Sequence, residues 1–459
     1  MLIYNTLSGK KEDLDKILGG KKKINMFVCG PTVYDEPHLG HARVAIFFDF
    51  TKRYLQSLGY KVKYVQNITD VDDKIIYRAE EEKTDWKTIA RKYEKEYLRG
   101  MKSLGVKSVD KYPRASGHIK AIIKQIKILE EKGFAYKTSS GVYFEVKKFS
   151  EYGKLSKQNL DELRSGWRIE PDPEKRDPMD FALWKLKKHA YEPSWQSPWG
   201  GGRPGWHIED TAITEKYFGP QYDLHGGGMD LKFPHHESEI AQQEAASGKK
   251  PFVKLWTHVG FLMVNGEKMS KSLKNFITVG DFLKTRAPEI LSFIFLQHHY
   301  RSPIDYTEKT AEQAYSALES LSQFLEKLKL AGGNKDVTEK ITESENNFNE
   351  ALDDDFNTPE ALATIFRLIN ELQQEMWSLS KRSAKNAAKW IVRKLNLLGS
   401  RPQIPKIPLK IKLLARKREL SRHSKQFTKS DALRKEIETL GYTIEDTPNG
   451  PFLWRIRKS

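Results

Sequence analysis

Two histidines flank a Leu-Gly pair in residues 38–41 (His-Leu-Gly-His), which follow a predicted strand and a turn-rich segment and stand at the start of a predicted helix. The first turn of a helix has unpaired backbone N–H groups, so it attracts anions such as phosphate, and imidazoles add directed donors. Gly40 carries no side chain, so a planar base can approach the backbone there. For His38 and His41 taken alone, the alternative is a pair of ordinary surface histidines.

Two lysines, Lys268 and Lys271, stand three residues apart in residues 268–272 (Lys-Met-Ser-Lys-Ser). Ammonium groups on flexible side chains suit the negative charge that develops on a leaving polyphosphate. Gly266 and the neighbouring serines permit a mobile loop. Taken alone, this string has a common basic loop as its alternative.

The elements that must position these strings follow from hydrophobic periodicity. The pattern predicts a strand, a helix and a second strand at residues 24–30, 41–58 and 60–68. Strand–helix–strand at this spacing is a βαβ unit, which implies a parallel sheet. A further helix is expected at residues 71–82, with Thr69 or Asp70 as its N-cap.

The middle of the chain interrupts this βαβ pattern. We expect a helix at residues 115–133, a hairpin at 136–145 and irregular structure at 161–205, where Pro, Trp and Gly are frequent. Another strand, at residues 254–264, resumes the sheet, so the middle segment is interpreted as an insertion. From residue 307 the pattern is helical almost throughout.

Composition restricts the class of protein. The 459 residues include 78 Lys and Arg against 61 Asp and Glu, so the formal net charge is +17. This favours a polyanionic partner, most simply nucleic acid, with a role in solubility alone as the alternative. Cys29 is the single cysteine, which excludes a disulfide within the chain and a zinc finger built on several cysteines. No apolar run is long enough for a membrane span, and residues 1–10 lack the features of a signal peptide, so a cytoplasmic location is expected.

The end of the chain is strongly basic. Residues 401–459 hold 15 basic and 6 acidic residues, a net charge of +9. Pro402, Pro405 and Pro408 mark a linker before it. We expect one small helix-plus-strand module with a basic face for phosphates, with a solvated basic tail as the alternative. Trp454 is a candidate for stacking on unpaired bases.

A family resemblance joins these strings. In this order, residues 38–41 and 268–272 resemble the two signatures of the class I aminoacyl-tRNA synthetases. Six more strings resemble the cysteinyl-tRNA synthetases within that class, at residues 27–35, 67–74, 178–185, 202–209, 225–231 and 233–239. The resemblance extends over essentially the whole chain, including the helical segment near residues 353–361.

The resemblance implies an α/β Rossmann-type parallel-sheet catalytic domain with an insertion, then an α-helical domain and a small mixed α/β C-terminal module. The implied divisions are a catalytic domain at residues 1–115 and 205–265, a connective insertion at 116–204, a signature-loop and stem-contact region at 266–310, a helical tRNA-binding domain at 311–400 and an anticodon-binding module at 401–459.

The family holds one zinc ion, Zn²⁺, and the resemblance implies Cys29, Asp210, His235 and Glu239 as its ligands here. Asp210 departs from the family, which usually has a second cysteine at this position. A carboxylate is a normal zinc ligand, and three anionic ligands are retained, but the set is harder than one with two thiolates. The alternatives are another divalent metal, or no metal, with Asp210 only hydrogen-bonding. For Cys29 considered alone, the alternative is a buried structural thiol.

The resemblance also implies the reaction: ATP with Mg²⁺ activates L-cysteine to an adenylate, and the cysteine passes to the 3′-terminal adenosine of tRNA(Cys). His38, His41, Lys268 and Lys271 would be catalytic, and Gly40 and Asp230 would bind ATP together with them. Thr69 and Trp206 would line the amino-acid pocket, although Trp206 alone could be a core aromatic. Residues 226–228 would let adenosine approach the backbone, and three histidines would surround the metal ligands, namely His207, His225 and His236.

Two other functions remain open at this point. One is a ligase that couples activated cysteine to an amine that is not tRNA, and the +9 tail argues against it. The other is a catalytically retired RNA-binding homologue, against which the intact histidines and lysines of the two signatures argue. A monomer that does not bind membranes is expected.

Overall fold

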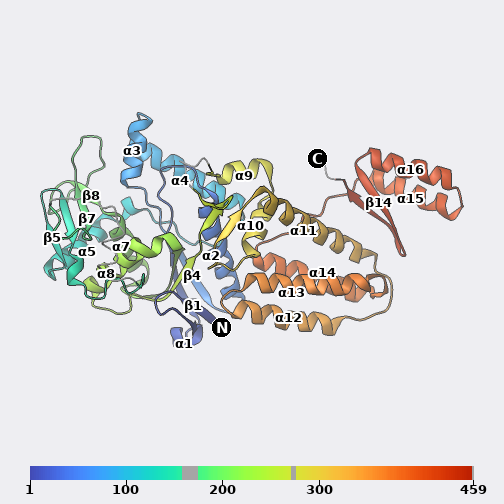
Figure 1. Ribbon diagram of the computed structural model, residues 1–459, viewed down its shortest axis with the longest axis horizontal. Helices are drawn as coiled ribbons and strands as arrows, with labels where there is room; N and C mark the ends of the chain where they lie inside the picture. The colour runs from blue at the N-terminus through green and yellow to red at the C-terminus, as the bar shows by residue number, and fades with distance from the viewer. Residues whose placement is uncertain (158–173, 270–274, 457–459) are drawn as a thin grey trace. The chain divides into compact units, whose positions relative to one another are not determined.

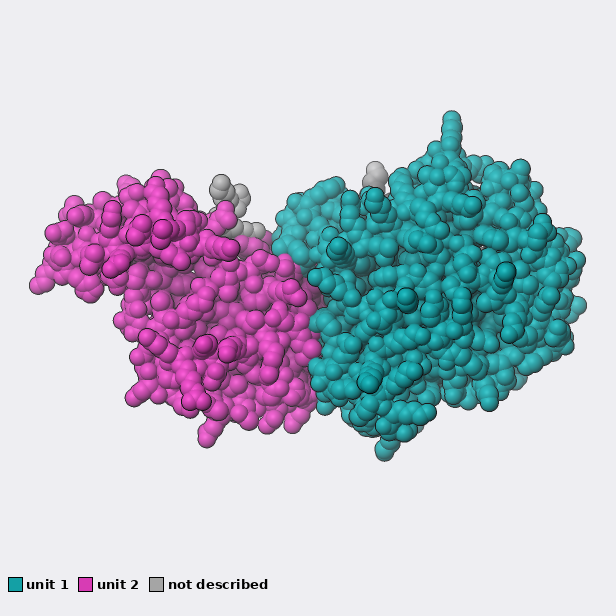
Figure 2. All heavy atoms as spheres, turned by 180° about the vertical axis from the view of Figure 1, so that it is seen from behind, with its two compact units in different colours: residues 1–288, 298–307, 353–357 teal, residues 289–297, 308–352, 358–459 magenta. Residues whose placement is uncertain are grey.

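The structure is a computed structural model that describes residues 1–157, 174–269 and 275–456. The chain forms two compact units, coloured separately in Figure 2. Unit 1 comprises residues 1–288, 298–307 and 353–357, and unit 2 comprises residues 289–297, 308–352 and 358–459.

A four-stranded parallel sheet forms the centre of unit 1. Its strands are β3 (Lys23–Val28), β4 (Lys61–Gln66), β9 (Tyr222–Gly228) and β10 (Val253–Val259), in the spatial order β10-β9-β3-β4. Helix α2 (Leu39–Ser57) connects β3 to β4, which confirms the predicted βαβ unit. From the middle of the sheet, β3 leads to β4 on one side and β9 leads to β10 on the other. The loops after β3 and β9 therefore diverge, and such a switch point leaves a crevice for a ligand.

Helix α2 packs on this sheet through a broad apolar face that includes Phe48 and Phe50, both fully buried. Gly226 lies in the middle of β9, and a Cβ atom there would overlap the ring of Phe48. The absence of a side chain at Gly226 therefore allows helix and sheet to pack closely.

The insertion contains a second, antiparallel sheet of β5 (Ala135–Lys137), β6 (Gly141–Phe144), β7 (Phe181–Leu186) and β8 (Gly202–Pro204). The hairpin at residues 136–145 was predicted correctly. The prediction of irregular structure at residues 161–205 was wrong for β7 and β8. Both strands are short, and the frequent Pro, Trp and Gly residues around them gave no alternating pattern that indicates a strand. Residues 158–173 lie outside the described part.

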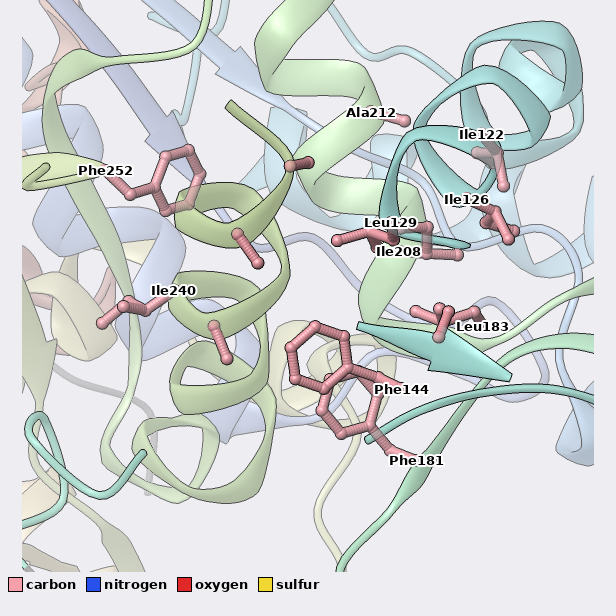
Figure 3. Close-up of a cluster of buried hydrophobic side chains, with 14 of the residues drawn as sticks. Ile122, Ile126, Leu129, Phe144, Phe181, Leu183, Ile208, Ala212, Ile240 and Phe252 are labelled. Carbon is pink, nitrogen blue, oxygen red and sulfur yellow. The ribbon is translucent and has the colours of Figure 1, made fainter. Parts of the chain in front are cut away.

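The insertion shares an apolar core with three helices, α5 (Ile119–Glu131), α7 (Trp206–Phe218) and α8 (Glu237–Ser247). Figure 3 shows Phe144 and Phe181 stacked beside each other and aliphatic side chains of the helices around them. Ile208 and Ala212 of α7 belong to this core, so they anchor the helix on which Asp210 lies.

The other regular elements of unit 1 lie around these two sheets. They are β1 (Leu2–Asn5), β2 (Lys10–Asp13), α1 (Leu14–Leu18), α3 (Asp73–Glu81), α4 (Trp86–Ser103), β11 (Leu262–Val264), β12 (Glu267–Lys268), α9 (Val279–Thr285) and β13 (Ile304–Tyr306). Helix α3 was predicted, but its cap was wrong: the Asp72 carboxylate accepts from Lys74 N, whereas Asp70 accepts from Ser116.

Unit 2 is mainly helical, as the sequence predicted. It contains most of α10 (Pro288–Leu296), then α11 (Glu308–Lys327), α12 (Thr338–Asp353), α13 (Thr358–Gln374) and α14 (Lys381–Leu398). Helix α13 packs against both α11 and α14 (Figure 1). No described helix combines the length and apolar character that crossing a membrane requires.

The C-terminal module is larger than the expected helix plus strand. It has two helices, α15 (Leu409–His423) and α16 (Phe427–Thr439), and a hairpin of β14 (Tyr442–Thr447) and β15 (Gly450–Arg455) around its own apolar core. Trp454 is buried, and its indole N–H donates to Glu319 Oε1 at 3.3 Å. The expectation that Trp454 stacks on bases is therefore wrong, because its ring is used inside the protein.

Substituting Gly226→Ala should destabilise unit 1 by about 1–3 kcal/mol, since the added methyl group overpacks the contact with Phe48. Chemical denaturation followed by circular dichroism measures this. Gly117→Ala is the matched control, because a Cβ there meets no atom within 4 Å. The packing argument fails if both variants lose the same stability, and Phe48→Leu should restore part of the loss in Gly226→Ala.

Candidate active site and metal centre

A cavity of about 330 Å³ opens at the carboxyl edge of the parallel sheet. Cys29 follows β3, Asn67 and Thr69 follow β4, and Gly228 ends β9, so all four strands bring their ends to this edge, with Gly260 after β10. This is the position at which open parallel sheets bind ligands.

Most of the candidate residues from the sequence meet in this cavity, although they come from distant parts of the chain. Its lining includes Cys29, His38, Gly40, His41, Thr69, Trp206, Asp210, Asp230, His235 and Lys268. Glu239 does not line the cavity and reaches Cys29 from inside the protein. Lys271 lies outside the described residues.

Four of these side chains form one buried group: Cys29, Asp210, His235 and Glu239. Asp210 Oδ2 lies 3.2 Å from Cys29 Sγ and 3.1 Å from His235 Nε2. Glu239 Oε1 lies 3.7 Å from Cys29 Sγ and 3.0 Å from His235 Nε2. The ligands of a tetrahedral zinc ion lie about 3.3–3.6 Å apart, given bonds of ~2.0–2.3 Å. The spacing of the four donor atoms therefore suits such an ion.

The charge of this group also suits a cation. Asp210 and Glu239 are fully buried, and among the described residues the ion pairs of both carboxylates are with histidines only. Glu239 Oε2 is buried without a hydrogen-bond partner. Buried carboxylates are costly unless they are paired, so thiol, imidazole and carboxylate donors facing one another fit a divalent transition metal.

The pKa shifts of Cys29, His235 and Glu239 also indicate a group that favours positive charge. Burial, and then the charges of Glu239 and Asp210, raise the pKa of the Cys29 thiol well above its usual value. Burial lowers the pKa of His235, but the two carboxylates outweigh it and raise that pKa to about 9. Burial raises the pKa of Glu239 to about 7 although His235 opposes it. The group thus attracts positive charge, which His235 supplies as imidazolium and which a metal ion would supply in its place.

Asn67 connects two of the candidate ligands, and sequence reasoning missed it. Its side-chain Nδ2 donates to Asp210 Oδ1 at 2.5 Å. Its side-chain Oδ1 accepts at 2.6 Å from the backbone N–H of Gly30, the residue that follows Cys29. Asp210 therefore has one oxygen held by Asn67 and the other, Oδ2, facing Cys29 and His235. The Thr69 hydroxyl donates to Glu209, and burial followed by the charge of Asp210 raises the pKa of Glu209.

His38 and His41 cap helix α2. His38 Nδ1 accepts from Gly40 N at 3.1 Å, and His41 Nδ1 accepts from His38 N at 3.3 Å, while the two rings stack 3.8 Å apart. Burial lowers the pKa of His38 to about 4 and that of His41 as well. Both rings are therefore neutral, and because Nδ1 is an acceptor, the proton of each lies on Nε2. The cap thus leaves each Nε2–H as a donor at the positive end of a helix.

The lysine signature contributes Lys268 to the same cavity. Lys268 ends the short strand β12, and its ammonium group lies 5.2 Å from the centre of the Phe261 ring. This is a loose contact, so the ammonium group is free to turn toward a polyphosphate.

The three glycines at the end of β9, at residues 226–228, do not share the single role that was expected for them. Gly226 accommodates Phe48, and a Cβ at Gly227 would lie 2.8 Å from an atom of the His236 ring. Only Gly228 lines the cavity, together with Asp230. The predicted approach of adenosine to residues 226–228 is therefore wrong for Gly226 and Gly227, because their missing side chains serve internal packing.

Trp206 and the additional histidines surround the buried group. Trp206 is 40% exposed, stacks on His235 with ring centres 4.2 Å apart, and lines the cavity, so it is not a core residue. His207 Nδ1 lies 2.8 Å from His235 Nδ1, which orients that ring. His225 and His236 come closer than expected, with Nε2 atoms 3.3 and 3.0 Å from Cys29 Sγ.

Comparison with known proteins identifies the family of the chain. Residues 17–316 match the family described as "tRNA synthetases class I (C) catalytic domain", and residues 347–400 match the "DALR domain". Curated relatives named "Cysteine--tRNA ligase" are similar along their whole lengths. The protein of Thermococcus gammatolerans is 47% identical and that of Aquifex aeolicus 42% identical, each over 99% of both chains.

Solved structures support the fold alone, because sequence identity to them is low. A methionyl-tRNA synthetase of Mycobacterium tuberculosis, in complex with methionyl-adenylate, matches with a TM-score of 0.61 and 15% identity, over 82% of this chain and 90% of that one. A putative arginyl-tRNA synthetase of Campylobacter jejuni gives a TM-score of 0.57 and 14% identity over 84% and 94%.

Substituting Asn67→Ala should weaken zinc binding about 10- to 100-fold, because Asp210 loses the donor that orients it. Competition with a chromophoric chelator measures the dissociation constant. The same substitution is also made in the Asp210→Cys variant, whose thiolate has no second oxygen for Asn67 to hold. Asn67→Ala should therefore lower the zinc affinity of that variant less than it lowers that of the parent chain. Equal zinc affinity of the parent chain and Asn67→Ala would contradict this role.

Proposed function

The chain belongs to the family of cysteine–tRNA ligases, and from this membership we propose that it activates L-cysteine with ATP and transfers it to the 3′-terminal adenosine of tRNA(Cys). The reaction releases pyrophosphate and then AMP, and its product serves protein synthesis. One observation carries the proposal best: the capping histidines of α2 line the same cavity as Cys29, Asp210 and His235 of the buried group.

We propose that the triphosphate of ATP binds in this cavity beside the first turn of α2. We propose that His38 and His41 donate from Nε2 to phosphate oxygens, and that Lys268 and Lys271 neutralise the leaving pyrophosphate. Gly40 would admit the adenine, and Asp230 would accept from the ribose hydroxyls. These groups act by positioning and by electrostatic stabilisation, as in phosphoryl transfer generally, with Mg²⁺ accompanying ATP.

We propose that the same cavity also holds a small amino acid with a thiol beside the buried Cys29 group. Thr69 and Trp206 would line the amino-acid pocket, with Trp206 stacked on His235. We propose zinc as the metal, one ion per chain, held by Cys29, Asp210, His235 and Glu239. A bound zinc ion would favour a thiolate over the hydroxyl of serine, which a pocket of the same shape would reject poorly.

Transfer RNA would bind through unit 2. Within it, the segment at residues 311–400 is the proposed helical tRNA-binding domain, and 401–459 the anticodon-binding module. Exposed basic side chains lie along α15, namely Lys410, Lys412, Arg416, Lys417 and Arg422. Residues 1–115 and 205–265 would form the catalytic domain around the insertion at 116–204, all within unit 1, and residues 266–310, which belong to both units, would contact the tRNA stem. A cytoplasmic monomer is proposed.

Cysteine-dependent exchange of pyrophosphate into ATP, followed by charging of a tRNA(Cys) transcript, tests this function. The parent chain should perform both reactions. Lys268→Ala should lower kcat/KM for exchange about 100-fold, because the leaving group loses a positive charge. Lys249→Ala, at an exposed lysine outside the cavity, is the matched control and should leave the rate unchanged.

The same pair of assays distinguishes the other functions. Exchange without charging would indicate a ligase whose acceptor is not tRNA. Absence of both reactions, in folded and zinc-loaded protein, would indicate a retired homologue. Normal exchange by Lys268→Ala would remove this lysine from the site.

Reversing three exposed charges on α15, as Lys412→Glu, Arg416→Glu and Lys417→Glu together, should weaken tRNA binding at least tenfold. Contacts to phosphates are lost, so the dependence of affinity on salt concentration should also become shallower. Filter binding across a salt series measures both quantities, and cysteine activation should be unaffected.

The control applies the same change in charge to exposed lysines of unit 1, as Lys16→Glu, Lys21→Glu and Lys249→Glu. If both triple variants weaken tRNA binding equally, net charge alone is responsible and α15 is not a contact surface. Loss of cysteine activation in the α15 variant would contradict the separation of the two functions.

A further inference from the structure

A second group of ligating side chains lies beside the first and shares two of its members. It consists of Cys29, His225, His236 and Glu239, whose donor atoms all lie within 4.8 Å of one another. His225 Nε2 and His236 Nε2 lie 3.3 and 3.0 Å from Cys29 Sγ. A tetrahedral zinc ion separates a sulfur and a nitrogen ligand by about 3.5 Å, so these distances suit a shared metal.

Both imidazoles are oriented by their second nitrogen. His225 Nδ1 lies 2.6 Å from the hydroxyl of Tyr222, and His236 Nδ1 lies 2.8 Å from His258 Nε2. His258 is held in turn by Thr6, whose Oγ1 is 2.9 Å from its Nδ1. Histidine ligands of metals typically have such partners, which fix the ring and leave the other nitrogen for the ion.

Glu239 belongs to both groups, and its Oε1 lies 3.7 Å from the shared Cys29 Sγ. Its Oε1 lies 3.0 Å from His235 Nε2, in the first group. Its Oε2 lies 3.5 Å from His225 Nδ1, is fully buried and has no hydrogen-bond partner. A buried carboxylate with an unpartnered oxygen is costly, and a cation bound by Glu239 would compensate the charge of that carboxylate.

The two groups differ in their access to the cavity. Cys29, Asp210 and His235 line it, whereas His225, His236 and Glu239 do not. An ion in the first group would therefore border the space for substrate, while an ion in the second group would be enclosed by protein. Open and closed positions of this kind distinguish catalytic from structural zinc sites.

We propose that Cys29, His225, His236 and Glu239 form a second, closed site for a divalent transition-metal ion, which is an alternative to the first because both need Cys29 and Glu239. Zinc at this position stabilises the core behind the cavity and is out of reach of substrate. The proposal concerns metal binding alone, so it stands or falls independently of the aminoacylation reaction.

The test is a full-length chain in which the first group is disabled, Asp210→Ala with His235→Ala. After removal of metal and reloading with Zn²⁺, this double variant should retain about one zinc per chain by elemental analysis. X-ray absorption at the zinc edge should show a sulfur ligand and two imidazoles, since the first group contains only one histidine. Circular dichroism verifies the fold, and Asp210→Asn with His235→Gln replaces the pair if the alanine variant does not fold.

Adding His236→Ala to the double variant is the matched control, and it should lower zinc affinity at least 100-fold. A folded double variant that binds no zinc would overturn the proposal. Zinc held with fewer than two imidazoles, or held equally well after His236→Ala, would also overturn it. Pyrophosphate exchange by the parent chain tests the proposed function separately and is not affected by either outcome.

Discussion

The burial of a thiol and two carboxylates at the edge of the parallel sheet is the constraint that organises this site. Cys29, Asp210 and Glu239 have no lysine or arginine among their described ion-pair partners, and enclosing such charge costs several kcal/mol unless it is compensated. Neighbouring side chains orient the candidate metal ligands through hydrogen bonds: Asn67 holds Asp210, and Tyr222 holds His225. The arrangement is stable only with positive charge at its centre.

The topology of the sheet explains why this group meets His38 and His41 at one cavity. Strands β3 and β9 are neighbours, but their connections run to opposite sides, so the loops after them separate and leave a cavity. One of these connections is α2, whose first turn is closed by His38 and His41. The same hydrogen bonds that cap this helix also fix the tautomer of both rings. The Nε2–H donors of His38 and His41 are therefore oriented in the folded protein without a ligand.

The insertion contributes rigidity. Its apolar core includes side chains of α7 and α8 (Figure 3). These helices place Asp210 and Glu239 near Cys29, with oxygen atoms 3.2 and 3.7 Å from its Sγ. Ile208 and Ala212 face that core on either side of Asp210 in the sequence, so one helix serves packing on one face and chemistry on another. The exposed basic side chains of α15 belong to unit 2, whereas the residues of the cavity belong to unit 1. The charge suited to a nucleic acid and the candidate active site are therefore on different units.

The sequence by itself determined the βαβ unit, the helical second half and, through family resemblance, which residues gather at the site. Local periodicity reports these elements because neighbours in the chain decide them. It failed where short segments depend on distant partners, as in β7 and β8, and where burial decides a role, as at Trp454 and Gly226. Asn67 and Asp210 are 143 residues apart, and Cys29 and His236 are 207 apart. Only the tertiary structure decided that these pairs touch, because no local pattern records which buried polar groups satisfy one another.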